Sequence, residues 1–321
     1  MKIVIADDTS GFNDNARAPS GAAQQRRLVS LALSVPAAAA QVPGMGAGRT
    51  EVDLGDQKEL AATIADAIGQ SLLNRGFLHE AKALIKEAYQ IRAEFLGDDH
   101  PATAASLNSR ARVARNEGRL DVAEQHSRAA LAINSRVFGQ ASYPVAQSLN
   151  ELARIQLQKS DPDAAEKSAT DGLDIVEALH LETKDLIVSR LLDTVGRVHQ
   201  FRGDYGRATE AYTRALALDL KLVGENHPEY VTHYANFATV KEAQGELEEA
   251  AKAYQKVIDL YERIELPQHP NRIDAEANLG AVLLAAAKTE SEYKAAGQHL
   301  NDALELNKRV RGQQHYLVGK D

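Results

Sequence analysis

Two sets of polar side chains recur at fixed distances before predicted turns of the chain. Six residues before the turns at Gly118, Ser160 and Gly203 stand Arg112, Arg154 and Arg197. Ten residues before the same turns stand Asn108, Asn150 and Asp193. Because residues four apart share one face of a helix, we expect both sets on one surface. Guanidinium groups fork onto carboxylates or phosphate, and amides pair with backbone N–H and C=O groups, so such a surface suits an extended, acidic peptide.

The row of guanidinium groups extends and then changes along the chain. Arg190 stands thirteen residues before the turn at Gly203. In the last two repeats, asparagines stand nine residues before the turn or its equivalent, and Thr239 and Ala281 replace arginine. We therefore expect the far end of the surface to be less basic. The predicted peptide-binding residues are Asn108, Arg112, Asn150, Arg154, Arg190, Arg197, Asn236 and Asn278.

A structural role is the alternative for both sets. An arginine on a helix face is often a solvated charge or the partner of an acidic residue in the adjacent repeat. Glu151 and Asp193 are available for that pairing. Asparagine can also bridge neighbouring helical hairpins. Recurrence does not decide between these roles, because a duplicated repeat produces it in either case.

The elements that carry these residues repeat with a regular period. Residues 203–230 predict a turn, an amphipathic helix, a second turn at Gly224 and a new helix from Pro228. Alanines recur every 42 to 46 residues, at Ala81, Ala123, Ala165, Ala208, Ala250 and Ala296. Small residues recur every 42 or 43 residues on the preceding helices, at Gly69, Ala111, Ala153, Gly196, Ala238 and Gly280. Paired small residues let two helices approach closely, and this period predicts an all-α solenoid of stacked hairpins.

The repeat units resemble the long tetratricopeptide repeats of kinesin light chains and of many bacterial proteins. The residues that carry the resemblance in one unit are His100-Pro101, Leu107-Asn108, Gly118, Ala123, Ala130-Leu131, Gly139 and Tyr143-Pro144. Parts of the motif return at His227-Pro228, Asn236, Gly245 and Ala250, and at His269-Pro270, Asn278-Leu279 and Ala303-Leu304.

The resemblance implies a right-handed α–α superhelix of about six hairpins, in which the first helices line a concave surface where ligands bind. Asn236 and Asn278 match the asparagines that hold the peptide main chain in the resembling family. Arginine stands at three positions where the light-chain pattern has aliphatic residues, and this departure argues against a kinesin-like cargo.

Six hairpins are predicted, at residues 58–98, 99–142, 143–184, 185–226, 227–268 and 269–312. Residues 1–57 are expected to form a polar, disordered N-terminal segment that ends in a Gly-rich linker. Within this segment, residues 26–40 have the basic start, apolar core and small residues of a signal peptide. That pattern favours export to the periplasm, whereas an ordinary Ala-rich helix at this place would leave the protein cytoplasmic.

Two departures from the repeat are expected near the C-terminus. About four extra residues around positions 288–293 should lengthen the turn inside the sixth hairpin. Residues 313–321 are predicted to form a short tail, too short for a polar capping helix. The last helix would then expose an apolar face, available for self-association or for a partner.

Composition excludes several classes of function. The 321 residues include 37 Lys and Arg against 45 Asp and Glu, and the net charge of −8 argues against a general nucleic-acid binder. The absence of cysteine excludes disulfides, thiolate catalysis and Cys-ligated zinc. The sequence contains no apolar stretch of about 20 residues, so we expect no integral membrane segment.

Histidines and motifs give no reason to expect chemistry. His100, His227 and His269 recur once per repeat before proline, so they are predicted to start helices rather than to share a metal ion. No nucleophile elbow or metal-hydrolase motif occurs. We therefore expect no catalysis and no cofactor, and interpret the chain as a scaffold for a protein or peptide ligand. Two alternatives stay open: a regulatory array working with a separately encoded caspase-like protease or signalling ATPase, and a structural array that self-associates.

Overall fold

The computed structural model describes residues 51–182 and 184–317, over which the chain forms twelve α-helices and no strand. The helices are α2 (Glu51–Asn74), α3 (Leu78–Leu96), α4 (Pro101–Asn116), α5 (Leu120–Phe138), α6 (Tyr143–Gln158), α7 (Pro162–Ala178), α8 (Leu186–Phe201), α9 (Tyr205–Leu222), α10 (Pro228–Ala243), α11 (Leu247–Arg263), α12 (Pro270–Ala286) and α13 (Glu290–Leu317). The all-α prediction is confirmed. Residues 1–50 of the predicted disordered segment, with the signal peptide predicted at residues 26–40, lie outside the described residues.

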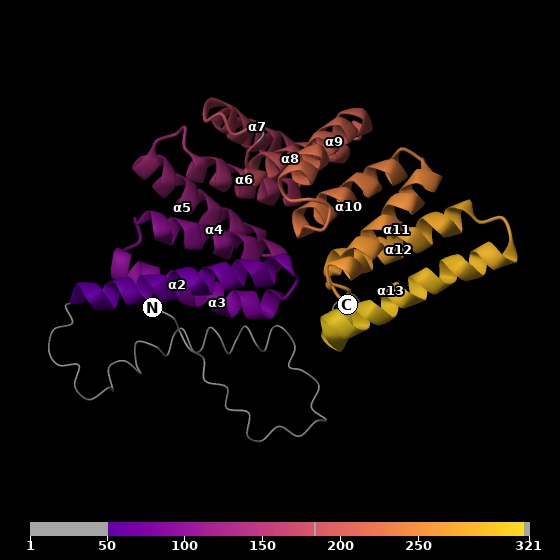
Figure 1. Ribbon diagram of the computed structural model, residues 1–321, viewed down its shortest axis with the longest axis horizontal. Coiled ribbons are helices and arrows are strands. Elements are labelled where there is room, and N and C mark those ends of the chain that lie inside the picture. The colour runs from indigo at the N-terminus through magenta and orange to yellow at the C-terminus, as the bar shows by residue number, and fades with distance from the viewer. Residues whose placement is uncertain (1–50, 183, 318–321) are drawn as a thin grey trace, which may run out of the picture.

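Consecutive helices pack as hairpins, and each hairpin stacks on the next. The pairs are α2–α3, α4–α5, α6–α7, α8–α9, α10–α11 and α12–α13. The first helices of successive hairpins also contact one another, so that α4 meets α6, α6 meets α8 and α8 meets α10. The hairpins follow one another around an arch, and the indigo first hairpin comes near the yellow last one (Figure 1). The superhelix of about six hairpins is therefore confirmed.

Small residues explain how closely the two helices of each hairpin approach. All the predicted small positions on both helices are buried. A Cβ atom on Gly196 would lie 2.9 Å from the Tyr212 ring, and one on Gly280 would lie 2.8 Å from Cγ of Leu300. Neither position has room for a larger side chain, which confirms the physical reason for the period.

Turns and caps separate the helices as the sequence predicts. Gly203 has a φ of +76°, and in the third hairpin Ser160 takes the corresponding place with a φ of 61°. At the helix starts, Nδ1 of His100, His227 and His269 accepts a hydrogen bond from the backbone N–H two residues ahead. This arrangement satisfies one of the free N–H groups of each helix, so the helix-start interpretation of these histidines is confirmed.

The array begins earlier and ends later than predicted. α2 begins at Glu51 instead of residue 58, so part of the predicted linker is helical. α13 continues through Gly312 to Leu317, so most of the predicted tail is helical too. A single glycine among good helix formers costs too little to end a helix.

The predicted lengthening of the sixth turn is wrong. α12 ends at Ala286 and α13 begins at Glu290, so this turn is no longer than the others. The extra residues lengthen α13 at its start instead. Thr289 and Glu292 hold that start as a capping box: Oε2 of Glu292 accepts from the Thr289 N–H at 2.9 Å, and Oγ1 of Thr289 accepts from the Glu292 N–H at 3.3 Å.

A buried arginine joins the first two hairpins. The guanidinium group of Arg92 donates to Oε1 of Glu59 at 3.2 Å and to Oδ2 of Asp66 at 3.1 Å. It also donates to Oγ1 of Thr63 at 3.0 Å and to Oγ of Ser106 at 2.8 Å. Every nitrogen of this guanidinium therefore has an acceptor within the protein.

At the interfaces between later hairpins, the positions equivalent to Arg92 and Ser106 hold other pairs of side chains. Between α9 and α10, Nδ1 of His233 lies 2.6 Å from Oδ2 of Asp219, and both residues are buried. Between α7 and α8, the same positions hold the buried apolar residues Val176 and Leu191. Each of these interfaces therefore pairs polar with polar or apolar with apolar side chains, as the cost of an unpaired buried group requires.

Candidate peptide-binding surface

The first helices bring the charged residues of hairpins two to five together on the inside of the arch. We call this the inner surface, and its members are Arg112, Arg115, Glu151, Arg154, Arg190, Asp193, Arg197 and Glu229. Arg112 on α4 interacts electrostatically with Arg154 on α6, with Arg190 on α8 and with Glu229 on α10. Charges from four successive first helices therefore act on one space.

Two inner-surface arginines are neutralised by carboxylates. Nε of Arg115 lies 2.7 Å from Oε1 of Glu151, and both side chains are buried. Arg190 binds Oε1 of Glu229 with two nitrogens, Nε at 3.0 Å and Nη2 at 2.6 Å. Arg190 therefore has the structural role considered for the arginines, because it pairs with an acidic residue of the adjacent repeat. Glu151, expected as a partner for the recurring arginines, pairs with Arg115 instead.

The three recurring arginines lack carboxylate partners. Nη2 of Arg112 donates to the neutral amide oxygen Oδ1 of Asn74 at 2.5 Å. Arg154 and Arg197 make no hydrogen bond or ion pair to any other residue in the described part of the chain, and Nε of Arg154 is buried without an acceptor. Three partly buried cations thus share the inner surface without counter-charges at bonding distance.

Burial and mutual repulsion act on these cations. Burial lowers the pKa of Arg112, and the neighbouring Arg154 and Arg190 lower it further, against the opposite effect of Glu151 and Glu229. The pKa of Arg154 is lowered first by Arg115 and then by burial. Arginine stays protonated despite such shifts, so the inner surface keeps a positive charge whose cost an anionic ligand would reduce.

The predicted asparagines form hydrogen bonds between hairpins. Nδ2 of Asn108 donates to Oγ of Ser148 at 2.9 Å, and Oδ1 of Asn150 accepts from Oγ1 of Thr194 at 3.0 Å. In this part of the surface the bridging role considered for asparagine is present. Oδ1 of Asn108 is buried without a donor, so one amide atom of this side chain is unused.

The later asparagines are engaged in the same manner. Nδ2 of Asn236 donates to Oδ1 of Asp193 at 2.7 Å, and Nδ2 of Asn278 donates to the Tyr254 hydroxyl at 3.3 Å. Asn278 lies on α12, beyond the helices that carry the inner surface. The structure therefore groups Asn236 with the arginines but gives Asn278 a partner of a different kind.

Glu229 is a member of the inner surface that sequence reasoning missed. Burial opposes its ionisation, but Arg190, His233 and Arg112 lower its pKa to about 2. It was missed because it lies in the first turn of α10, whereas the recurring residues were counted back from the hairpin turns. Its spacing of four residues from His233 is a signal that would place both on one helix face.

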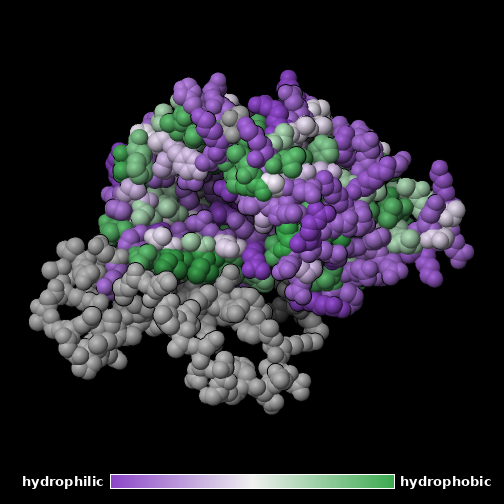
Figure 2. Space-filling view, viewed as in Figure 1, coloured by the Kyte–Doolittle hydropathy of each residue, from purple (hydrophilic) through white to green (hydrophobic). Residues whose placement is uncertain are grey.

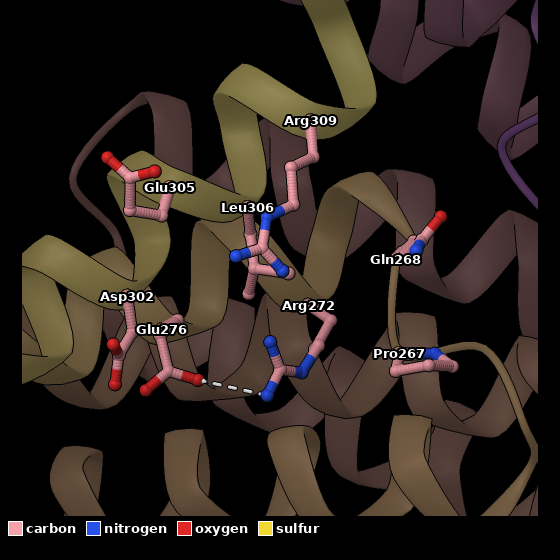
Figure 3. Close-up of a pocket in the computed structure, with 8 residues that line it drawn as sticks. All are labelled: Pro267, Gln268, Arg272, Glu276, Asp302, Glu305, Leu306 and Arg309. Atoms are coloured by element: carbon pink, nitrogen blue, oxygen red, sulfur yellow. Dashed lines mark ion pairs between the residues drawn. The ribbon is translucent and has the colours of Figure 1, made fainter.

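Two cavities lie beside the last hairpin, and the larger one reaches the inner surface at Arg115. The smaller, of about 320 Å³, is lined by α12, α13 and the segment before α12, where Arg272 points to Glu276 at 3.5 Å (Figure 3). The larger, of about 1160 Å³, lies between residues 73–82 of the first hairpin and residues 265–274 of the last. Neither is lined by any of the eight predicted peptide-binding residues. Among residues 51–182 and 184–317, no group of three metal-ligating side chains gathers, and no helix is long and apolar enough to span a membrane.

Comparison with known proteins agrees with this architecture. A family model described as "Tetratricopeptide repeat" matches residues 60–133, 106–178 and 187–263, which together span more than half of the chain. No curated protein matches the sequence significantly.

Solved structures with a similar fold come from several proteins. A putative kinesin light chain of Podosopora anserina with nearly identical TPR-like repeats is 19% identical, with a TM-score of 0.50, over 66% of this chain and 99% of that one. BtubC (BKLC) of P. vanneervenii is 21% identical, with a TM-score of 0.52, over 76% and 91% of the two chains. The apo form of RapI is 14% identical, with a TM-score of 0.52, over 77% and 83%. At these identities the likeness concerns the fold alone.

Proposed function

This chain belongs to the tetratricopeptide repeat family, and from that premise we propose that it is a non-catalytic scaffold that binds an extended, acidic peptide or partner protein along its inner surface. Stacked hairpins of this kind create long concave surfaces suited to protein–protein interaction. The acidic character of the ligand is our specific inference for this chain.

One observation carries the proposal: Arg112, Arg154 and Arg197 have no carboxylate at bonding distance, whereas Arg115 and Arg190 on the same surface do. Desolvated charge is costly unless it is paired. Carboxylates of a bound peptide would supply the missing partners through charge-assisted hydrogen bonds.

The test is a peptide-array binding assay at low and high salt with wild type and with the triple variant Arg112→Ala, Arg154→Ala, Arg197→Ala. We expect wild type to retain acidic peptides, more weakly at high salt, and the triple variant to lose them. A matched control is the triple variant Arg128→Ala, Arg207→Ala, Arg214→Ala, which removes three exposed charges from the second helices α5 and α9. Circular dichroism verifies that both variants stay helical. Equal binding by the two variants would refute the proposal.

Self-association is a second candidate with its own observation. Figure 2 shows an apolar strip along α2, where Leu60 is 59% exposed. At the other end of the array, Tyr293 and Leu304 on α13 are 50% and 42% exposed. Light scattering over a range of protein concentrations tests this candidate, because a constant monomer mass would remove it.

A further inference from the structure

The first and last hairpins touch. Nε2 of His269, just before α12, lies 3.0 Å from the backbone carbonyl oxygen of Asn74, the last residue of α2. Beside this contact, Pro270 lies so close to Gly76 that a Cβ atom there would be 2.5 Å from the proline Cδ. We call these four residues the clasp. The clasp joins positions 195 residues apart and closes the arch of Figure 1 into a ring.

The chemistry of His269 suits this contact. Its Nδ1 accepts from the Asn271 N–H at 3.1 Å, so the hydrogen of the neutral ring is on Nε2 and is donated to the Asn74 carbonyl. Burial lowers the pKa of His269 to about 4, which keeps the ring neutral at pH 7. The ring also stacks on Tyr261 at a centroid distance of 4.7 Å. The Asn74 carbonyl is at a helix end, where it has no partner within the helix.

Asn74 connects the clasp to the inner surface. Its backbone carbonyl accepts from His269, while its side-chain Oδ1 accepts from Nη2 of Arg112. Apart from the clasp, the cavity of about 1160 Å³ separates much of the first hairpin from the last. The two ends therefore meet over a small area, and a modest change at Asn74 affects a large part of their contact.

We propose that the clasp is a latch that an acidic ligand opens, through competition of its carboxylate with Asn74 for Arg112. This inference rests on the proposed function, because it requires an anionic ligand on the inner surface. A charged acceptor makes a stronger hydrogen bond to a guanidinium group than a neutral amide does. Once Arg112 turns to the ligand, Asn74 loses one of its two polar anchors. By thermodynamic reciprocity, opening the clasp raises the affinity for the acidic ligand.

The variant that isolates the clasp is His269→Asn. Asparagine is a good helix N-cap, so the start of α12 is kept, but its side chain is too short to reach Asn74. His227→Asn is the matched control, because His227 caps α10 in the same way and has no contact with the first hairpin in the described part of the chain. Spin labels on cysteines introduced at the exposed Ser71 and Asn301 report the distance between the first and last hairpins. The natural chain has no cysteine to interfere with labelling.

The probe is a polyglutamate peptide, added to each labelled protein and also titrated for affinity. We expect His269→Asn to lengthen the label distance without peptide, His227→Asn to leave it unchanged, and the peptide to lengthen it in wild type. We also expect His269→Asn to bind the peptide about fivefold more tightly, at the low end of allosteric couplings.

Three outcomes would overturn the latch, and they are distinguishable. An unchanged label distance in His269→Asn would show that the clasp does not hold the ends together. Peptide binding without a distance change would remove the coupling and leave the proposed function intact. Absence of peptide binding to wild type and to His269→Asn would remove the latch and the proposed function together.

Discussion

Two arginines, Arg92 in the first hairpin and Arg154 in the third, lie in contrasting electrostatic surroundings. Arg92, between α3 and α4, has an acceptor for every nitrogen, including the carboxylates of Glu59 and Asp66. Arg154, on the inner surface, has no partner in the described part of the chain, and its Nε is buried without an acceptor. Burial costs both guanidinium groups hydration free energy, but only Arg92 has partners within the protein that offset this cost. The difference is our basis for assigning a structural role to one arginine and a ligand to the other.

The largest effect is expected at the paired arginine. Arg92→Met leaves Glu59 and the buried Asp66 without their cation, and we expect a loss of about 3–5 kcal/mol in the free energy of unfolding. Urea unfolding followed by circular dichroism measures this loss. Arg136→Met is the control, because its ion pair with Asp99 is exposed and is expected to contribute under about 1 kcal/mol. Equal effects of the two substitutions would break the comparison.

An intermediate effect is expected from Glu229, the inner-surface carboxylate that does have a partner. Its pKa in the folded protein is about 2, below the ordinary value of 4.5, so its contribution to stability is full above pH 4.5 and is lost as pH falls toward 2. At neutral pH we expect this contribution to be on the order of 3 kcal/mol. Unfolding of wild type and Glu229→Gln between pH 2 and pH 6 tests this, since the variant should lack that part of the pH dependence. Parallel curves for the two proteins would contradict the assignment.

The smallest effect on stability is expected at the unpaired arginine. Arg154→Met removes a cation that Arg115 repels, and Glu151 keeps its bond to Arg115, so we expect a stability change within about 0.5 kcal/mol. Binding of an acidic peptide should nevertheless weaken about tenfold, equivalent to about 1.4 kcal/mol. Urea unfolding and fluorescence anisotropy of a labelled peptide measure the two quantities. Arg154→Lys keeps the charge and should recover part of the binding. A large loss of stability in Arg154→Met would give this arginine the same role as Arg92.

Most of the fold could be predicted from the sequence, because the repeated small residues depend on local geometry. Gly196 faces Tyr212 and Gly280 faces Leu300 at distances that exclude a larger side chain. The regular spacing of such small residues along the sequence therefore indicates where the two helices of each hairpin cross. The sixth turn was predicted wrongly because length was counted without considering capping. Thr289 and Glu292 are spaced as a capping box, and that signal would have assigned the extra residues to α13.

The candidate site could be predicted only in part, because pairing depends on neighbouring hairpins. Counting from the turns placed Arg112, Arg154 and Arg197 on successive first helices. It could not show that Glu151 would pair with Arg115 rather than with Arg112. These two arginines lie on one face of α4, and which of them reaches Glu151 depends on the rotation of α4 against α6. The clasp was beyond sequence reasoning altogether, because it depends on the curvature accumulated over six hairpins.

Closure of the array affects how the molecule comes apart. In a linear repeat protein each end unit has a single neighbour, and opening of the structure begins by fraying at those ends. Here His269 and Pro270 rest on the first hairpin at Asn74 and Gly76, so both end units are supported from two sides. Fraying from either end therefore has to break the ring first. Backbone amides in α2 and α12 gain a protection against hydrogen exchange that the same hairpins would lack in an open chain.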